Sequence, residues 1–177
     1  QTLAPDLKII APVREWKWTR TQELEFANQH GIEVEATKKS IFSTDQNLWG
    51  RSIEAGILED PWIEPPPETF QWTVDPAHAP DQPEEVEIEF DRGKPTTLNG
   101  EELDGTTLIE RLNTIAGKHG VGRIDHVENR LVGIKSREIY EAPAAVVLHE
   151  AHRELEFLTL SKNAIRFKTL VSQEYRG

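Results

Sequence analysis

The residues best suited to bind a ligand or to take part in a reaction lie in two short runs, 122–130 and 136–143, on either side of Gly133. Together these runs hold carboxylates, guanidinium groups, a phenol and an amide. Glu128 precedes the glycine and Tyr140 follows it, so a chain reversal at Gly133 would bring both side chains to one place. A carboxylate suits an ammonium or ureido N–H group, and a phenol supplies a directional hydroxyl. This density predicts a site for a polar ligand.

Three basic residues accompany this pair: Arg130, Lys135 and Arg137. They can neutralise Glu128, or they can meet a carboxylate or phosphate of a ligand. The alternative is an internal network of ion pairs on a solvated sheet face, which is the commoner use of such clusters. The residues alone leave both interpretations open.

A second candidate is the segment 43–52, in which Ser43 and Ser52 flank Gly50. An odd separation places two side chains of an uninterrupted strand on opposite faces, so a shared site requires a bulge or bend, which we expect at Gly50. The alternative is a turn in which Ser43 and Asp45 hydrogen-bond to their own backbone.

Other motifs give weaker evidence of a functional site. The glycines at 117, 120 and 122 follow an expected helix and precede an expected strand, whereas a dinucleotide fingerprint follows a strand and opens a helix. They predict a tight turn with close backbone approach instead. His149 and His152 can reach one metal, but their spacing is not that of the zinc protease motif, and surface histidines are commoner. We predict no metal site and keep a metal hydrolase only as a weak alternative.

Composition narrows the class of protein. The chain has 177 residues, 37% of them hydrophobic, which fits one globular domain with part of a second. It contains no cysteine, which excludes disulfides and thiol chemistry and fits a reducing compartment, so a cytoplasmic location is expected. The net charge of -11 disfavours nucleic acid, and no apolar run is long enough to predict a membrane span.

The elements that must position these residues follow from local patterns. Residues 7–10 predict a strand, and a capping box at Thr19 predicts a helix that ends at residues 30–31. This order is typical of the tail of a larger α/β sheet. Residues 61–83 hold most of the eleven prolines and predict an irregular strap, tethered to the core by three buried aromatic residues. These aromatic residues are Trp62, Phe70 and Trp72.

Further along, residues 86–100 predict an antiparallel hairpin, and Asp104 predicts the start of an amphipathic helix that stops at Gly117. Pro143 opens another helix that runs to about residue 160, and Ser161 caps a last one. The fold class expected is therefore α+β, with a mixed or antiparallel sheet packed by amphipathic helices. It is preceded by the terminal strand and helix of an α/β domain.

Read together, four blocks resemble argininosuccinate synthase over nearly the whole chain: residues 5–16, 43–49, 54–61 and 117–130. The resemblance implies that residues 1–35 are the end of an ATP-binding α/β domain. It implies that residues 36–177 are the citrulline-binding and multimerisation domain, truncated before a C-terminal arm. The upstream ATP loop is not in this sequence.

That family condenses citrulline with aspartate and uses ATP with Mg²⁺ to adenylate the ureido oxygen. The resemblance assigns four citrulline contacts: Ser43, Ser52, Glu128 and Tyr140. It implies a homotetramer, ATP held mainly by the upstream half, no catalytic residue in this chain, and no activity of this chain alone. The alternative is a non-catalytic ligand-binding or oligomerisation module with the same fold.

Three departures from the commoner family pattern stand near the site: His126 replaces an aliphatic residue, Glu138 a glycine, and Ala144-Ala145 paired glycines. If the glycine at 138 has a positive φ in the family, Glu138 would strain the turn and displace Tyr140. The role of Tyr140 therefore depends on the backbone at residue 138.

Overall fold

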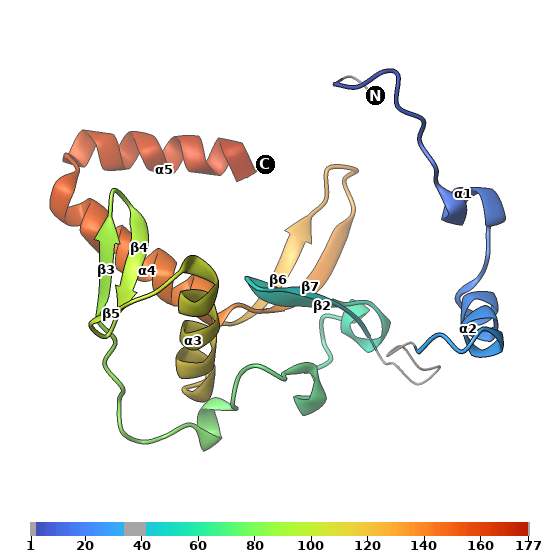
Figure 1. Cartoon of the computed structure of the whole chain (residues 1–177), viewed down its shortest axis with the longest axis horizontal. Coiled ribbons are helices and arrows are strands. Elements are labelled where there is room, and N and C mark those ends of the chain that lie inside the picture. Colours follow the sequence, from blue (N-terminus) through green and yellow to red (C-terminus); the bar gives the residue numbers. More distant parts are fainter. Residues whose placement is uncertain (1–2, 34–41, 177) are drawn as a thin grey trace. The chain divides into compact units, whose positions relative to one another are not determined.

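The computed structural model describes residues 3–33 and 42–176 (Figure 1). The chain forms two compact units, residues 1–40 and residues 41–177. The domain boundary expected between residues 35 and 36 lies outside the described residues. The two units are therefore considered separately.

The N-terminal unit contains α1 (Pro12–Trp16) and α2 (Arg20–Gln29). The predicted capping box is confirmed, because the Thr19 side chain accepts from the backbone N–H of Gln22 while the Gln22 side chain accepts from the backbone of Thr19. The strand predicted at residues 7–10 is wrong. No described segment pairs with these residues, and Ile10 is 80% exposed, so their apolar side chains lack the neighbouring strand that would bury them.

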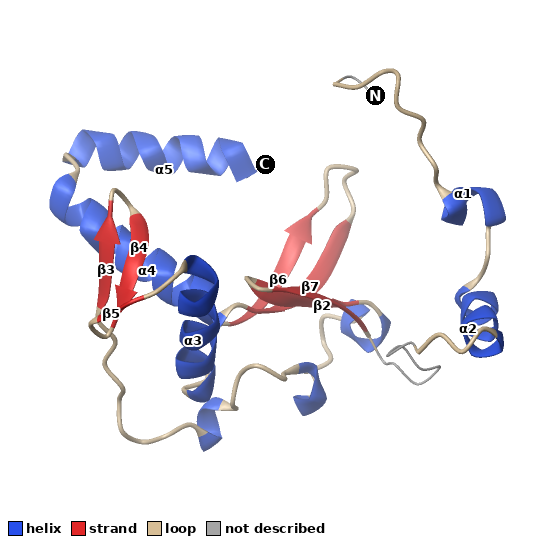
Figure 2. Cartoon of the chain, in the orientation of Figure 1, coloured by secondary structure: helices blue, strands red, loops and turns tan. Residues whose placement is uncertain are grey.

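The C-terminal unit is built on two antiparallel sheets (Figure 2). The larger sheet has the order β1-β2-β7-β6, and its strands are β1 (Ser43–Asn47), β2 (Gly50–Glu54), β6 (Arg123–Asn129) and β7 (Lys135–Glu141). The smaller is the predicted hairpin with a short third strand: β3 (Ile88–Asp91), β4 (Lys94–Leu98) and β5 (Glu101–Glu102). Together with its helices, this arrangement confirms the α+β class.

Helices α3 (Gly105–Lys118) and α4 (Pro143–Thr159) pack on the smaller sheet around one apolar cluster. The cluster is Leu98, Leu108, Leu112, Ala144 and Leu148. Asp104 caps α3 as predicted, by accepting from the backbone N–H groups of residues 106 and 107. The helix does not stop at Gly117 but runs one residue further, because Gly117 does not have the positive φ that commonly ends a helix, and the first such residue is Gly120.

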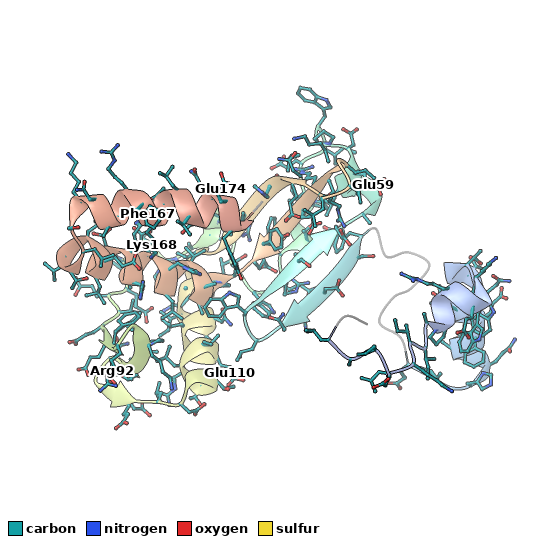
Figure 3. The ribbon with its side chains drawn as sticks, turned by 90° about the horizontal axis from the view of Figure 1, so that it is seen from above. Glu59, Arg92, Glu110, Phe167, Lys168 and Glu174 are labelled. Atoms are coloured by element: carbon teal, nitrogen blue, oxygen red, sulfur yellow. The ribbon has the colours of Figure 1, made fainter. Side chains whose placement is uncertain are left out.

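Helix α5 (Lys162–Arg176) is the last element, and the Ser161 hydroxyl accepts from the backbone N–H of residue 164 as its predicted cap (3.3 Å). Lys168 of α5 pairs with Glu156 of α4, which ties the two helices together (Figure 3). Phe167 remains 70% exposed. One face of α5 is therefore apolar and open in this chain.

The proline strap is irregular as predicted, apart from two single 3₁₀ turns, η2 (Pro67–Thr69) and η3 (Pro76–His78). A further 3₁₀ turn, η1 (Gly56–Glu59), precedes the strap. Phe70 packs against the buried residues Ile53, Leu58 and Ile139 and so tethers the strap to the larger sheet. Trp72 is half-buried, but Trp62 is 94% exposed, and its expected role as a tether is wrong.

Candidate functional site

The two candidate serines share one face of the larger sheet, by a hairpin and not by a bulge. The side chain of Asn47 accepts from the backbone N–H groups of residues 49 and 50 (2.8 and 3.3 Å) and closes a tight turn between β1 and β2. Ser43 lies opposite Glu54, and Ser52 lies two residues before Glu54 on β2. Cross-strand partners and alternate residues share a face, so both hydroxyls point to the same side. Of the bulge or bend expected at Gly50, the bend is what the structure has: a tight turn directly precedes Gly50, which is itself the first regular residue of β2.

Glu128 and Tyr140 lie on that same face. The predicted reversal at Gly133 is confirmed: Gly133 has φ +80° and joins β6 to β7. Tyr140 lies opposite Ser52 across the β2–β7 pair, and Glu128 lies opposite residue 136 across the β6–β7 pair. The Tyr140 hydroxyl donates to the Glu128 carboxylate. The sheet thus brings all four predicted site residues to one side.

The Tyr140 hydroxyl also donates to a second carboxylate, that of Glu138 (Oη to Oε2, 2.9 Å). Partial burial, the hydrogen bonds to Glu128 and Glu138, and the charges of both carboxylates together raise the pKa of Tyr140 far above its ordinary value. The phenol therefore remains protonated at physiological pH. It serves as a hydrogen-bonding group and not as a base.

Glu138 does not strain the backbone, so that expectation is wrong. The φ angle of Glu138 is not positive, and Glu138 is a regular residue of β7, opposite His126. The extended backbone of a strand accepts any side chain, and the alternation of β7 places the Glu138 carboxylate beside the phenol. Tyr140 is therefore supported by Glu138 and not displaced by it.

Of the three nearby basic residues, none forms an ion pair with Glu128. Arg130 pairs with Glu138 (2.6 Å) and Glu54 (2.8 Å). Lys135 donates to a neighbouring asparagine, and Arg137 pairs with Asp125 on the opposite face of the sheet. The ion-pair network is thus the right interpretation for Arg130 and Arg137. Within the described residues, Glu128 is left as a half-buried carboxylate with no cationic partner.

The other residues singled out in the sequence lie apart from the phenol. Ala144 and Ala145 are buried at the start of α4, where they pack in the core. His149 packs edge-on against Trp49, and Nδ1 of His152 lies 3.2 Å from Glu156. In the portion of the chain that is described, no three histidine, aspartate or glutamate side chains gather to hold a metal ion.

Sequence reasoning missed Glu141, the residue that fastens the proline strap to the sheet. Its side chain is fully buried and accepts from three consecutive backbone N–H groups of the strap, at residues 71, 72 and 73, within 2.8–3.1 Å. It also accepts from the Thr73 hydroxyl (2.7 Å) and pairs with the buried Arg51. The one sequence signal is an acid at the end of a strand, directly before Ala142 and the helix.

The buried carboxylate fixes the position of the strap on the sheet. Arg123 extends the contact, because its guanidinium donates to the Thr73 hydroxyl (2.8 Å) and stacks 3.9 Å from the centre of the Phe70 ring. Tyr140 directly precedes Glu141, so the strap anchor and the candidate site belong to the same strand.

The four site residues form an open wall. A cavity of about 710 Å³ lies between the strap and β6, and another of about 540 Å³ lies between the β1–β2 turn and α3. Neither cavity is lined by the four residues. Among the helices of the described residues, none is both long and apolar enough to span a bilayer.

These features define the class of the domain: an α+β domain whose antiparallel sheet carries an acidic and hydroxyl-rich wall. A family model described as "Arginosuccinate synthase C-terminal domain" matches residues 42–177, and one described as "Arginosuccinate synthase N-terminal HUP domain" matches residues 1–33. The chain belongs to the argininosuccinate synthase family.

Curated relatives named argininosuccinate synthase match almost the whole chain. The chain is 62% identical to the argininosuccinate synthase of Symbiobacterium thermophilum over 173 residues, which is 98% of this chain and 43% of that protein. It is 62% identical to the Rubrobacter xylanophilus protein, again over 98% of this chain, and 59% identical to that of Streptococcus suis over 97% of it. The chain thus spans about two fifths of the length of these relatives.

Proposed function

We propose that this chain supplies the citrulline-binding wall of an enzyme that condenses citrulline with aspartate, using ATP, to give argininosuccinate, AMP and pyrophosphate. The observation that carries the proposal is the uncompensated carboxylate of Glu128, which lies on one face with Tyr140, Ser52 and Ser43. A carboxylate receives ammonium or ureido N–H groups, and hydroxyl groups both donate and accept. Citrulline carries both kinds of partner.

The same face does not fit the phosphates of ATP, which bring their Mg²⁺ with them. Its charged side chains are four carboxylates, from Asp45, Glu54, Glu128 and Glu138, and one guanidinium, from Arg130, and a net negative surface repels a polyphosphate. We therefore assign ATP, Mg²⁺ and aspartate to other parts of the full-length protein. We further propose that the full-length protein is a cytoplasmic homotetramer, as the resemblance to the family implies.

The work of this chain is then positioning. Fixing citrulline in one orientation makes the following step effectively unimolecular, which is a large part of what enzymes gain over solution. Tyr140 does not serve as a general base, because its raised pKa keeps the hydroxyl protonated. The chain alone is expected to be inactive.

Replacing Glu128 tests the proposed site. In the full-length protein, Glu128→Gln is expected to weaken citrulline binding about 10- to 100-fold, because a hydrogen bond to a charged acceptor is exchanged for one to a neutral amide. Calorimetric titration of citrulline measures this. The matched control is Asp125→Asn, a carboxylate of the same strand on the opposite face, which is expected to leave the affinity unchanged. Equal affinity of the native and Glu128→Gln proteins means that the site is misplaced.

Turnover separates the enzyme from a binding module. The full-length protein is expected to release AMP and pyrophosphate when citrulline, aspartate and ATP are all present. A protein that binds citrulline but releases no AMP is instead a non-catalytic ligand-binding module.

A further inference from the structure

Two carboxylates compete for one proton at the candidate site. The Tyr140 hydroxyl is within hydrogen-bonding distance of Glu128 and of Glu138. A phenol has a single O–H, so it donates to only one of them at a time. The other carboxylate must then find its partner elsewhere.

The two carboxylates are not equivalent. Glu138 is 7% exposed, and its second oxygen accepts from Nη2 of Arg130 (2.6 Å). Arg130 is itself held by the hydroxyl of Ser136 (Nε to Oγ, 2.9 Å) and by Glu54. Glu138 is therefore fixed and compensated in charge, whereas Glu128 is compensated by no described residue and is open to a ligand.

We propose that Glu138 is a positioning residue that turns Tyr140 into an acceptor for the ligand, an inference that rests on the proposed function. When an N–H group of citrulline donates to the carboxylate of Glu128, the hydroxyl of Tyr140 rotates and donates to Glu138 instead. The lone pairs of the Tyr140 oxygen then face the ligand and accept a second N–H. No covalent bond is broken, because the hydroxyl only exchanges one hydrogen-bond acceptor for the other.

The geometry also defines the ligand group that this arrangement selects. It must present at least two N–H donors to neighbouring acceptors, one for the carboxylate of Glu128 and one for the oxygen of Tyr140. An ammonium group and the ureido end of citrulline meet this requirement. A carboxylate or phosphate does not, since it would face Glu128 and Glu138 together.

A double-mutant cycle in the full-length protein tests the coupling between Glu138 and Tyr140. Calorimetric titration is expected to show that Glu138→Ala weakens citrulline binding about tenfold when Tyr140 is present, and less than about twofold in the Tyr140→Phe background. Glu138→Gln keeps a neutral acceptor and is expected to fall between native and Glu138→Ala. The matched control is Asp125→Asn, which removes the ion-pair partner of Arg137 on the opposite face without touching Arg130 or the phenol, and it is expected to leave the affinity unchanged.

The inference fails if Glu138→Ala costs the same factor with and without the Tyr140 hydroxyl, because Glu138 then acts only through the fold. If native protein does not bind citrulline, the proposed function fails, and a ligand-free measurement decides the inference. The Cζ resonance of Tyr140, in protein labelled with ¹³C-tyrosine and assigned by its loss in Tyr140→Phe, is compared at neutral pH. Glu138→Ala, but not Asp125→Asn, is expected to shift this resonance, because Glu138 accepts from the Tyr140 hydroxyl and Asp125 does not. An unchanged resonance overturns the inference.

Discussion

Glu141→Gln is expected to destabilise the C-terminal unit by about 3–5 kcal/mol, because it breaks a buried ion pair from one side. The carboxylate of Glu141 collects the backbone N–H groups of residues 71–73 and the guanidinium of Arg51, and both side chains are almost completely buried. An amide has only one acceptor oxygen, so its NH₂ group would face donors. Urea unfolding of the native and variant chains, followed by tryptophan fluorescence, measures the loss.

Glu101→Gln provides the matched control, since it also breaks a glutamate–arginine pair, but an exposed one with Arg111. Exposed ion pairs contribute little to stability, so this variant is expected to unfold almost as the native chain does. An equally small effect of Glu141→Gln would show that the strap is not held by the buried carboxylate.

The same residue predicts a dependence of stability on pH. Burial alone would raise the pKa of Glu141, but the hydrogen bonds from the strap backbone, from Thr73 and from Arg51 outweigh it, and the net shift is downward. A carboxyl with a lowered pKa in the folded state stabilises the fold above its ordinary value of 4.5, and this contribution is lost as the pH falls below that value. Acid titration should show a shallower loss of stability in Glu141→Gln than in the native chain.

Local signals in the sequence were sufficient for much of the fold. The capping box at Thr19, the cap at Asp104 and the reversal at Gly133 each depend on residues close in the chain. The 86–100 hairpin and the amphipathic stripe of α3 likewise follow from short periodic patterns. Such features need no knowledge of distant partners.

The errors came from contacts between distant segments. The strand predicted at residues 7–10 needs a neighbouring strand, and burial of Trp62 needs a segment that covers it, whereas Trp62 is 94% exposed. The strap residues that donate to Glu141 are 68–70 residues away in sequence, and Arg51 is 90 residues away, so no local pattern reveals them.

The candidate site shows the same division. A common face for Ser43 and Ser52 requires a bulge or bend, and the local sequence does not show which of the two it is; the structure provides a hairpin turn. Glu138 was judged from a family pattern and not from its place in β7, where alternation alone puts it beside Tyr140. Sheet register decides both points, and register is set by the whole sheet.

Gly122→Ala is expected to destabilise the C-terminal unit by about 3 kcal/mol or more, because the residue has no room for a side chain and an unfavourable backbone for one. Its φ is +101°, and a Cβ there would lie 2.5–2.8 Å from backbone atoms of residues 142 and 143. The carbonyl of Gly122 also accepts from the backbone N–H of Ala142 (2.9 Å), which joins the start of β6 to the start of α4.

Gly133→Ala is the matched control: its φ is +80°, but a Cβ would meet nothing within 4 Å, so only the conformational cost of about 1 kcal/mol is expected. Urea unfolding of both variants isolates the close approach. Equal losses would mean that the backbone conformation, and not the contact with the first turn of α4, requires glycine at residue 122.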